Sequence, residues 1–196
     1  ILTKDLGYDY YFGPDIAPNA DNPLRRDWSQ LILDNKLEKA IDKINDISKE
    51  IKTKAIKKLK RLKGNQIIHN NKKFHRFLKE GTKVEYRNNK GEIRTETVKI
   101  IDDDVKNNNF TVVNQFSIVE GDKPRRPDIL IFLNGIPISL IELKNAGDEK
   151  ADINKAYKQI QTYKEEIPSI FCFNELLIIS DGTYAQAGTI KKPNIN

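Results

Sequence analysis

Three ionisable residues stand at the ends of two apolar runs in the second half of the chain. Asp128 precedes the run 129–133, and Glu142 and Lys144 close the run that begins at Ile138. Burying an ionised group without a partner is costly, so three charges at one end of a hairpin are an expensive way to build a sheet. Their types and spacing therefore predict a site that carries chemistry. The alternative is a surface cluster of salt bridges.

The predicted geometry suits a divalent metal ion. Glu142 and Lys144 are two residues apart on a strand, so they share a face, and the hairpin brings Asp128 close to Glu142. Two carboxylates at one edge form a hard-oxygen site suited to Mg²⁺, which takes one or two carboxylates together with water and phosphate. The ion would stabilise charge on a phosphate and lower the pKa of a bound water. Lys144 would orient that water or offset charge in the transition state, and the Leu143 carbonyl could supply a further ligand.

This site sets a condition on how the two strands pair. A strict two-residue turn at Asn134-Gly135 pairs position 133 with 136, and Asp128 would then face away from Glu142. Pairing 128 with 142 requires an odd-length or bulged connection, or a bend at Pro127-Asp128. The site therefore predicts one of these irregularities. Carboxylates on opposite faces of the sheet, beyond about 8 Å, would contradict it.

A helix predicted at 152–165 carries two further polar candidates. Gln159 and Tyr163 are four residues apart, so they lie on one face beside an apolar stripe. As part of the site, both would project toward Lys144 and contact phosphate or position the lysine. The alternative makes Tyr163 a ring at the edge of the core and Gln159 a solvated amide.

The pattern along the whole chain predicts an α/β or α+β fold. Residues 1–26 are rich in Gly, Pro, Asp and Asn and are expected to be irregular. Apolar spacing predicts helices from Asp27, over 49–63 and over 71–80. Alternation predicts a hairpin at 83–87 and 94–101, and strands at 110–119, 128–133, 138–144, 176–180 and 184–190. The two strands of the site are apolar on both faces and belong in the middle of a central mixed sheet flanked by helices.

Positive charge is concentrated in one part of the chain. The 196 residues carry a net charge of +6, but fifteen Lys and Arg stand against four acidic residues between Lys36 and Lys79, an excess of eleven. A local basic surface is typical of a protein with a polyanionic partner, although a solvated lysine-rich helix has the same composition. We expect the surface formed by 49–63 with Arg76 and Lys79 to guide DNA or to dock a partner.

Composition also disfavours several classes of protein. No apolar run approaches the ~18 residues of a membrane span, and the first residues lack the layout of a signal peptide. No Gly-Lys-Ser/Thr phosphate loop is present, so no ATP site of the usual kind is expected.

The single cysteine, Cys172, excludes an internal disulfide and is expected to be a buried thiol. His69 and His75 lack a usual metal spacing and are expected to be structural. A cytoplasmic location fits these features.

Longer motifs surround the predicted site. They are Asn114-Gln115-Phe116, Arg125-Arg126-Pro127-Asp128-Ile129, Phe132-Leu133-Asn134-Gly135-Ile136-Pro137, Ile141-Glu142-Leu143-Lys144-Asn145, Gln159…Tyr163 and Ile179-Ser180-Asp181-Gly182. Together they closely resemble the N-terminal nuclease domain of the R subunit of type I restriction-modification enzymes, which is a PD-(D/E)xK endonuclease. The resemblance extends from about residue 24 to 190.

The resemblance implies an organisation and an activity. It implies a basic N-terminal helical extension at 1–80, a restriction-endonuclease-like core at 81–190 and a linker at 191–196 toward an ATP-dependent motor absent from this chain. It implies Mg²⁺-dependent cleavage of double-stranded DNA after ATP-driven translocation, in a complex with methyltransferase and specificity subunits. Such a chain need not cut DNA on its own, because the motor would normally feed DNA to it.

The resemblance also implies a set of site residues. The catalytic residues of the nuclease motif fall on Asp128, Glu142 and Lys144, with Asp128 and Glu142 as metal ligands. The Gln-x-x-x-Tyr motif falls on Gln159 and Tyr163. A glutamate in an early helix assists in the wider superfamily, and Glu38 is the candidate for it.

Two other functions remain open. One is a non-catalytic module that binds DNA or docks subunits through the basic helices, and the intact triad argues against it. The other is a stand-alone structure-specific nuclease, such as a junction resolvase, which predicts that the isolated chain cuts branched DNA without ATP.

Overall fold

The structure is a computed structural model that describes residues 3, 5–144, 153–181 and 184–191. Its α-helices are α1 (Asp34–Ile44), α2 (Lys49–Lys60), α3 (Ile67–Glu80) and α4 (Ile153–Glu166). Its strands are β1 (Asp9–Phe12), β2 (Thr82–Arg87), β3 (Ile93–Val98), β4 (Phe110–Asn114), β5 (Ile118–Glu120), β6 (Lys123–Arg125), β7 (Ile129–Leu133), β8 (Ile136–Leu143), β9 (Leu176–Ser180) and β10 (Ala185–Gly188). Short 3₁₀ turns lie at Gly13–Ile16, Val105–Asn107 and Pro168–Cys172.

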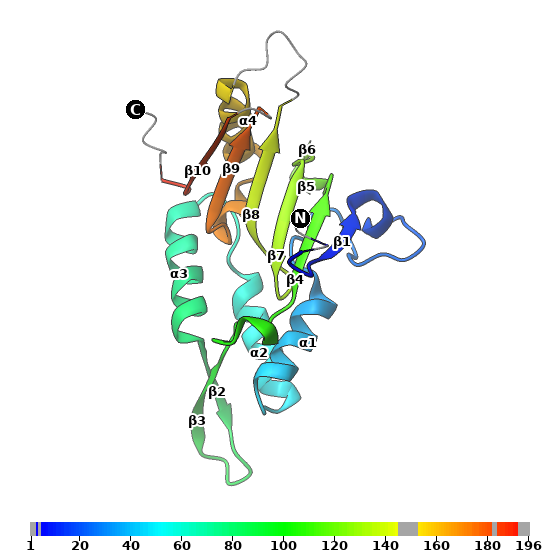
Figure 1. Cartoon of the computed structure of the whole chain (residues 1–196). Helices are drawn as coiled ribbons and strands as arrows, with labels where there is room; N and C mark the ends of the chain where they lie inside the picture. The colour runs from blue at the N-terminus through cyan, green and yellow to red at the C-terminus, as the bar shows by residue number, and fades with distance from the viewer. Residues whose placement is uncertain (1–2, 4, 145–152, 182–183, 192–196) are drawn as a thin grey trace.

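A six-stranded mixed sheet forms the centre of the molecule, in the order β1-β4-β7-β8-β9-β10 (Figure 1). The β1–β4 and β8–β9 pairs are parallel, and the other neighbours are antiparallel. The strands β7 and β8 occupy the middle of the sheet, as their two apolar faces predicted, and Leu130, Phe132 and Leu140 are fully buried there. The prediction of a mixed α/β fold around a mixed central sheet is confirmed.

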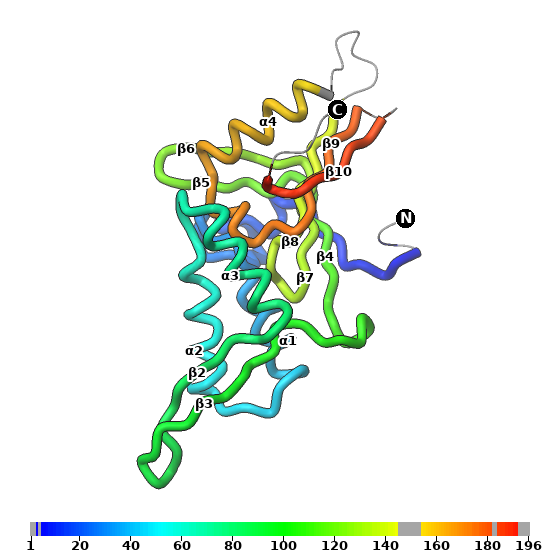
Figure 2. Tube along the Cα trace, turned by 90° about the vertical axis from the view of Figure 1, so that its left-hand side faces the viewer, coloured from blue at the N-terminus to red at the C-terminus, as the bar shows by residue number. Residues whose placement is uncertain are grey.

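The helices pack against this sheet in two groups. Helix α4 contacts β8 and β9 and lies behind them in Figure 1. Helices α1, α2 and α3 lie toward the end of the sheet that holds the β7–β8 turn, and the hairpin β2–β3 extends from them (Figure 2). A continuous core links the two groups through residues such as Leu37, Leu59 and Phe74.

The N-terminal part differs from the prediction in two ways. Residues 9–12, expected to be irregular, form β1 and pair with β4 from Asp9 with Thr111 to Phe12 with Asn114. The helix expected from Asp27 begins only at Asp34. Asp27 instead accepts hydrogen bonds from the backbone N and the hydroxyl of Ser29, at 2.9 and 2.6 Å, which favours a turn over a helix.

The strand expected over 110–119 is also divided. Strand β4 ends at Asn114, and Gln115 follows with a φ of 60° that no strand accommodates. The chain then turns into the small β5–β6 hairpin, which pairs Ile118 with Arg125 and is separate from the central sheet. The predicted hairpin at 83–87 and 94–101 is present as β2–β3, also outside the central sheet.

Several other expectations can be compared with the structure. Cys172 is buried, and burial raises the pKa of its thiol to about 11, as expected for an unreactive side chain. His75 lies 3.1 Å from the Glu175 carboxylate, an exposed structural contact. No helix in the described ranges combines the length and the apolarity that a membrane crossing requires. The expected linker falls mostly on 192–196, outside the described residues.

Candidate active site

An irregular pairing of β7 with β8 brings the two predicted carboxylates together. The tight turn at Asn134-Gly135, with φ values of 51° and 80°, pairs Leu133 with Ile136. The register then shifts between Ile131 and Phe132, so that farther along Ile129 pairs with Ile141. The next step of this register sets Asp128 opposite Glu142, on the same face of the sheet. Of the irregularities that the sequence left open, the pairing therefore contains a bulge, placed within the strands and not in the turn.

Asp128 is held by two donors from different segments. Its Oδ2 accepts a hydrogen bond from the backbone N of Leu143 at 2.8 Å, and its Oδ1 accepts one from Nε2 of Gln115 at 3.1 Å. The first contact crosses directly to the strand that carries Glu142. The carboxylate is therefore fixed at the end of the hairpin.

Glu142 is the most buried charge of the cluster, with 4% of its surface exposed. Lys144 Nζ lies 3.1 Å from its Oε1, and the Tyr163 hydroxyl donates to its Oε2 at 3.2 Å. Burial and the nearby charge of Asp128 raise the pKa of Glu142, and Lys144 and Tyr163 only partly oppose them. The Glu142 carboxyl therefore ionises less readily than a free glutamate, despite its contacts with Lys144 and Tyr163.

Helix α4 contributes the remaining predicted residues. Tyr163 is 3% exposed, and burial, reinforced by Glu142, raises the pKa of its hydroxyl well above the ordinary value. The hydroxyl therefore stays protonated and serves as a donor. Gln159, half-buried one turn earlier, hydrogen-bonds to Tyr163. The two residues reach the cluster, but Tyr163 contacts the Glu142 carboxylate, whereas the sequence suggested contact with phosphate or Lys144.

The structure adds Gln115, which the sequence analysis did not single out. It lies in the Asn114-Gln115-Phe116 motif, between two apolar segments. The local signal in the sequence is the polar pair Asn114-Gln115, which interrupts an apolar stretch and so indicates the end of a strand. Nothing local indicates its long-range contact with Asp128.

Glu38 lies away from the cluster of Asp128, Glu142 and Lys144. Helix α1 starts beside the β7–β8 turn, where Leu33 N donates to the Gly135 carbonyl at 2.8 Å. The five residues of β7 span about 16 Å at the usual rise per residue, and Asp128 lies beyond their far end. Glu38 is exposed, one turn into this helix. It therefore belongs to the turn end of the hairpin and not to the end that carries the carboxylates.

The donor set fits a hard divalent cation. Asp128 and Glu142 face each other with a repulsion that such a cation would relieve, and their oxygens keep lone pairs beyond the hydrogen bonds described. Across the described ranges, no group of three or more His, Cys, Asp or Glu is arranged to hold a metal. Two carboxylates suit Mg²⁺, which usually keeps several of its own waters, whereas zinc sites draw three or four protein ligands.

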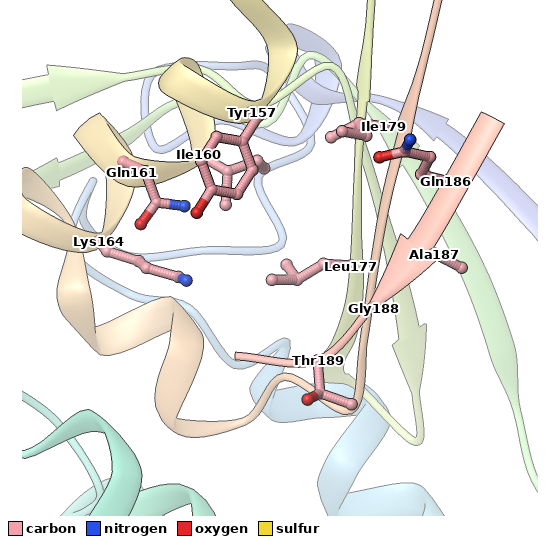
Figure 3. Close-up of a pocket in the computed structure, with 10 residues that line it drawn as sticks. All are labelled: Tyr157, Ile160, Gln161, Lys164, Leu177, Ile179, Gln186, Ala187, Gly188 and Thr189. Carbon is pink, nitrogen blue, oxygen red and sulfur yellow. The ribbon is translucent and has the colours of Figure 1, made fainter. Parts of the chain in front are cut away.

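A small hollow on the other flank of α4 is distinct from this cluster. It has an empty volume of about 350 Å³ between α4 and the strands β9 and β10 (Figure 3). Ile160 and Tyr157 point into it from the helix, and Leu177 lies opposite. Its lining contains no carboxylate, so the acidic cluster remains the candidate active site.

Comparison with known proteins places the chain in a family. Residues 1–194 match the family model described as Type I restriction enzyme R protein N terminus (HSDR_N). The chain is 34% identical over 190 residues to the type I restriction enzyme HindI endonuclease subunit of Haemophilus influenzae, and 32% identical over 191 residues to the putative MjaIXP endonuclease subunit of Methanocaldococcus jannaschii. Each alignment covers 95% of this chain and 18% of the relative. The chain therefore belongs to the family of N-terminal domains of type I restriction enzyme R proteins.

Proposed function

We propose that this chain is the endonuclease domain of a type I restriction enzyme R subunit and hydrolyses DNA phosphodiester bonds with Mg²⁺. The observation that carries the proposal is the clustering of Asp128, Glu142 and Lys144 at one end of the two central strands of the sheet. The carboxylates lie on one face, and the lysine is 3.1 Å from Glu142. Burial and the charge of Asp128 raise the pKa of Glu142, and perturbed carboxylates of this kind cluster at functional sites.

Each residue has a role that follows from its contacts. Asp128 and Glu142 hold Mg²⁺, which when bound supplies charge stabilisation at the phosphate and acidifies a water molecule. Lys144 orients the attacking water or offsets the negative charge that develops on the phosphate. Tyr163 fixes Glu142 through its protonated hydroxyl, and Gln159 supports Tyr163.

The size of the relatives supports a function within a larger protein. The chain spans 18% of the length of the two relatives described above. We propose that cutting follows ATP-driven translocation by a motor outside this chain, in a cytoplasmic complex with methyltransferase and specificity subunits. The domain then acts on double-stranded DNA delivered to it.

A basic groove supports contact with the DNA backbone. It has an empty volume of about 970 Å³, and its lining contains five cationic side chains and one acidic side chain, Glu80. The cationic residues are Lys58, Arg61, Lys73, Arg76 and Lys83. Three other lysines of α2 form ion pairs: Lys52 with Asp42, Lys54 with Glu50 and Lys60 with Asp34. Uncompensated like charges in one groove favour a polyanion such as the phosphate backbone.

The test of the nuclease proposal separates cutting from translocation. Asp128→Ala, Glu142→Ala and Lys144→Ala are introduced into the assembled restriction enzyme, and DNA cleavage and ATP-driven translocation are measured on the same preparations. Cleavage by the two carboxylate variants should fall by at least about 100-fold, since a catalytic metal contributes several kcal/mol and each 1.36 kcal/mol is tenfold. Translocation should be retained in all three variants.

A matched control makes the outcome specific. Glu38→Ala removes an exposed acidic residue at the turn end of the hairpin and should leave both activities unchanged. Normal cutting by all three site variants would reject the proposal. Cutting of branched DNA by the isolated chain without ATP would favour a stand-alone nuclease instead.

A further inference from the structure

Gln115 has a backbone conformation that its residue type disfavours. Its φ of 60° lies in the left-handed region, and the only other described non-glycine residue there is Asn134, of a type that tolerates the region better. A strained residue of this kind persists where the surrounding structure holds it in place, and such residues cluster at functional sites. The strained conformation of Gln115 allows both its backbone and its side chain to contact Asp128.

Both ends of Gln115 bind the same residue. Its backbone N donates to the Asp128 carbonyl at 2.8 Å, and its side-chain Nε2 donates to Asp128 Oδ1 at 3.1 Å. The backbone contact fixes where Asp128 lies, and the side-chain contact fixes how its carboxylate is turned. With Oδ2 held by Leu143 N, the carboxylate plane is defined by two donors.

The N-terminal segment supports this corner from behind. A Cβ on Gly13 would lie 2.2 Å from the Gln115 carbonyl oxygen, so the two backbones approach as closely as glycine permits. The buried Arg25 donates to the Ser117 carbonyl at 2.8 Å, and its guanidinium carbon lies 3.8 Å from the centre of the Phe116 ring. Residues 13 and 25 thus brace the three positions 115–117.

We propose that Gln115 is a positioning residue that orients Asp128 for metal binding, braced by the N-terminal segment. The inference rests on the nuclease function proposed above and adds a residue to it. The amide leaves one carboxylate lone pair free on Oδ1 while preventing rotation about the side chain. The N-terminal extension thereby contributes to the site without carrying a residue that touches the metal.

The experiment measures metal binding apart from activity. Binding of Mn²⁺, as a paramagnetic substitute for Mg²⁺, is titrated by electron paramagnetic resonance on the 196-residue chain and on Gln115→Gly and Gln115→Glu. Glycine adopts the positive φ freely, so Gln115→Gly should fold while lacking the donor. Loss of an outer partner of a metal ligand typically weakens metal binding 10- to 100-fold, and we expect Gln115→Gly in that range. Gln115→Glu should be at least as weak, because it keeps the shape but cannot donate.

The controls distinguish the inference from the function on which it rests. Asn134→Gly changes the other non-glycine residue at positive φ, at the turn end of the same hairpin, and should bind Mn²⁺ as the unaltered chain does. Mn²⁺ affinity of Gln115→Gly equal to that of the unaltered chain would overturn the positioning role. Absence of binding by the unaltered chain would instead overturn the metal site itself. Thermal unfolding of each variant verifies that the protein compared is folded.

Discussion

The Tyr163 hydroxyl donates a hydrogen bond to Glu142 Oε2 at 3.2 Å, joining helix α4 to the end of strand β8. Both residues are almost fully buried, with 3% and 4% of their surfaces exposed. Burial raises the pKa of each group. The phenol therefore keeps its proton and can donate it in a hydrogen bond, which stabilises the ionised form of the buried carboxylate. The helix therefore positions the carboxylate that we propose as a Mg²⁺ ligand, as well as covering the sheet.

Tyr163→Phe should lower DNA cleavage while leaving translocation unchanged. The substitution keeps the ring in the core but leaves Glu142 Oε2 without its donor, and changes to such supporting partners typically cost 10- to 100-fold. We expect about a tenfold loss in cleavage by the assembled enzyme. Tyr157→Phe is the matched control, because Tyr157 lies on the same helix but faces the hollow of Figure 3. Equal losses for the two variants would show that helix packing, and not the contact with Glu142, is responsible.

Glu142→Gln should stabilise the metal-free protein at neutral pH. The folded state raises the pKa of Glu142 above its ordinary value of 4.5, so it binds the proton more tightly than the unfolded chain does. This contribution to stability is fully present below the unfolded pKa and is lost as the pH rises through the folded pKa. Glutamine does not titrate, so the excess melting temperature of the variant should grow between pH 4.5 and 8. Thermal unfolding in EDTA measures the difference.

Added Mg²⁺ should make the unaltered protein melt at a higher temperature than Glu142→Gln. A ligand that binds only the folded state at 100 times its Kd stabilises it by about 2.7 kcal/mol, and the variant lacks one of the two carboxylates that we propose as ligands. The unaltered protein should therefore gain melting temperature with Mg²⁺ at pH 7.5, and Glu142→Gln should gain much less. If the melting temperature of Glu142→Gln exceeded that of the unaltered protein by the same amount at every pH, the ionised Glu142 carboxylate would not be the cause of the difference.

The centre of the site could be predicted because its signals are local and strong. The strands β7 and β8 are apolar on both faces, so their central place in the sheet follows from the sequence alone. The need to bring Asp128 opposite Glu142 then predicted an irregular pairing, and the structure contains one in the form of a bulge. The i, i+4 spacing of Gln159 and Tyr163 likewise placed them on one face of a helix that was itself well predicted.

The parts that escaped prediction depend on contacts between distant segments. Strand β1 has little apolar alternation and forms because β4 offers it a parallel edge. Gln115 leaves the strand because Asp128, thirteen positions later, and Gly13, far earlier in the chain, together impose its conformation. Asp27 does not begin a helix, because its hydrogen bonds with Ser29 favour a turn. The spacing of apolar residues along the sequence carries no information about any of these contacts.

Asn134→Ala should cost stability at the turn between β7 and β8. Asn134 is fully buried; its Oδ1 accepts from Asn109 N at 2.8 Å, and its Nδ2 donates to the Ile100 carbonyl and to Asn108 Oδ1, both at 2.9 Å. Leaving buried groups unpaired costs roughly 1–3 kcal/mol each, so we expect a loss of about 3 kcal/mol in the free energy of unfolding. Asn134→Gly should lose less, because glycine accepts the φ of 51° without strain.

Urea denaturation of both Asn134 variants gives the measurement, with Asn89→Ala as an exposed control in another turn. A loss below about 1 kcal/mol for Asn134→Ala would mean that water replaces the three side-chain contacts. Equal losses for alanine and glycine would show that the positive φ adds no cost at this position.

The basic groove should contribute to the salt dependence of DNA binding. Each phosphate neutralised on duplex DNA contributes a slope of about −0.9 in log affinity against log salt. Replacing three cationic residues of the groove by glutamine should therefore flatten the slope by up to about three units and weaken binding at low salt. The residues are Arg61, Lys73 and Arg76. Fluorescence anisotropy with a labelled duplex, over a series of salt concentrations, measures both effects.

A control of equal charge decides whether the groove or the net charge is responsible. It replaces three exposed lysines outside the groove, namely Lys39, Lys90 and Lys106. Both triple variants lose three positive charges, so long-range attraction falls equally, whereas direct phosphate contacts are lost only in the groove variant. Equal slopes for the two variants would remove the groove from the DNA-binding surface. Unchanged DNA binding with impaired assembly of the complex would reassign the groove to a protein partner.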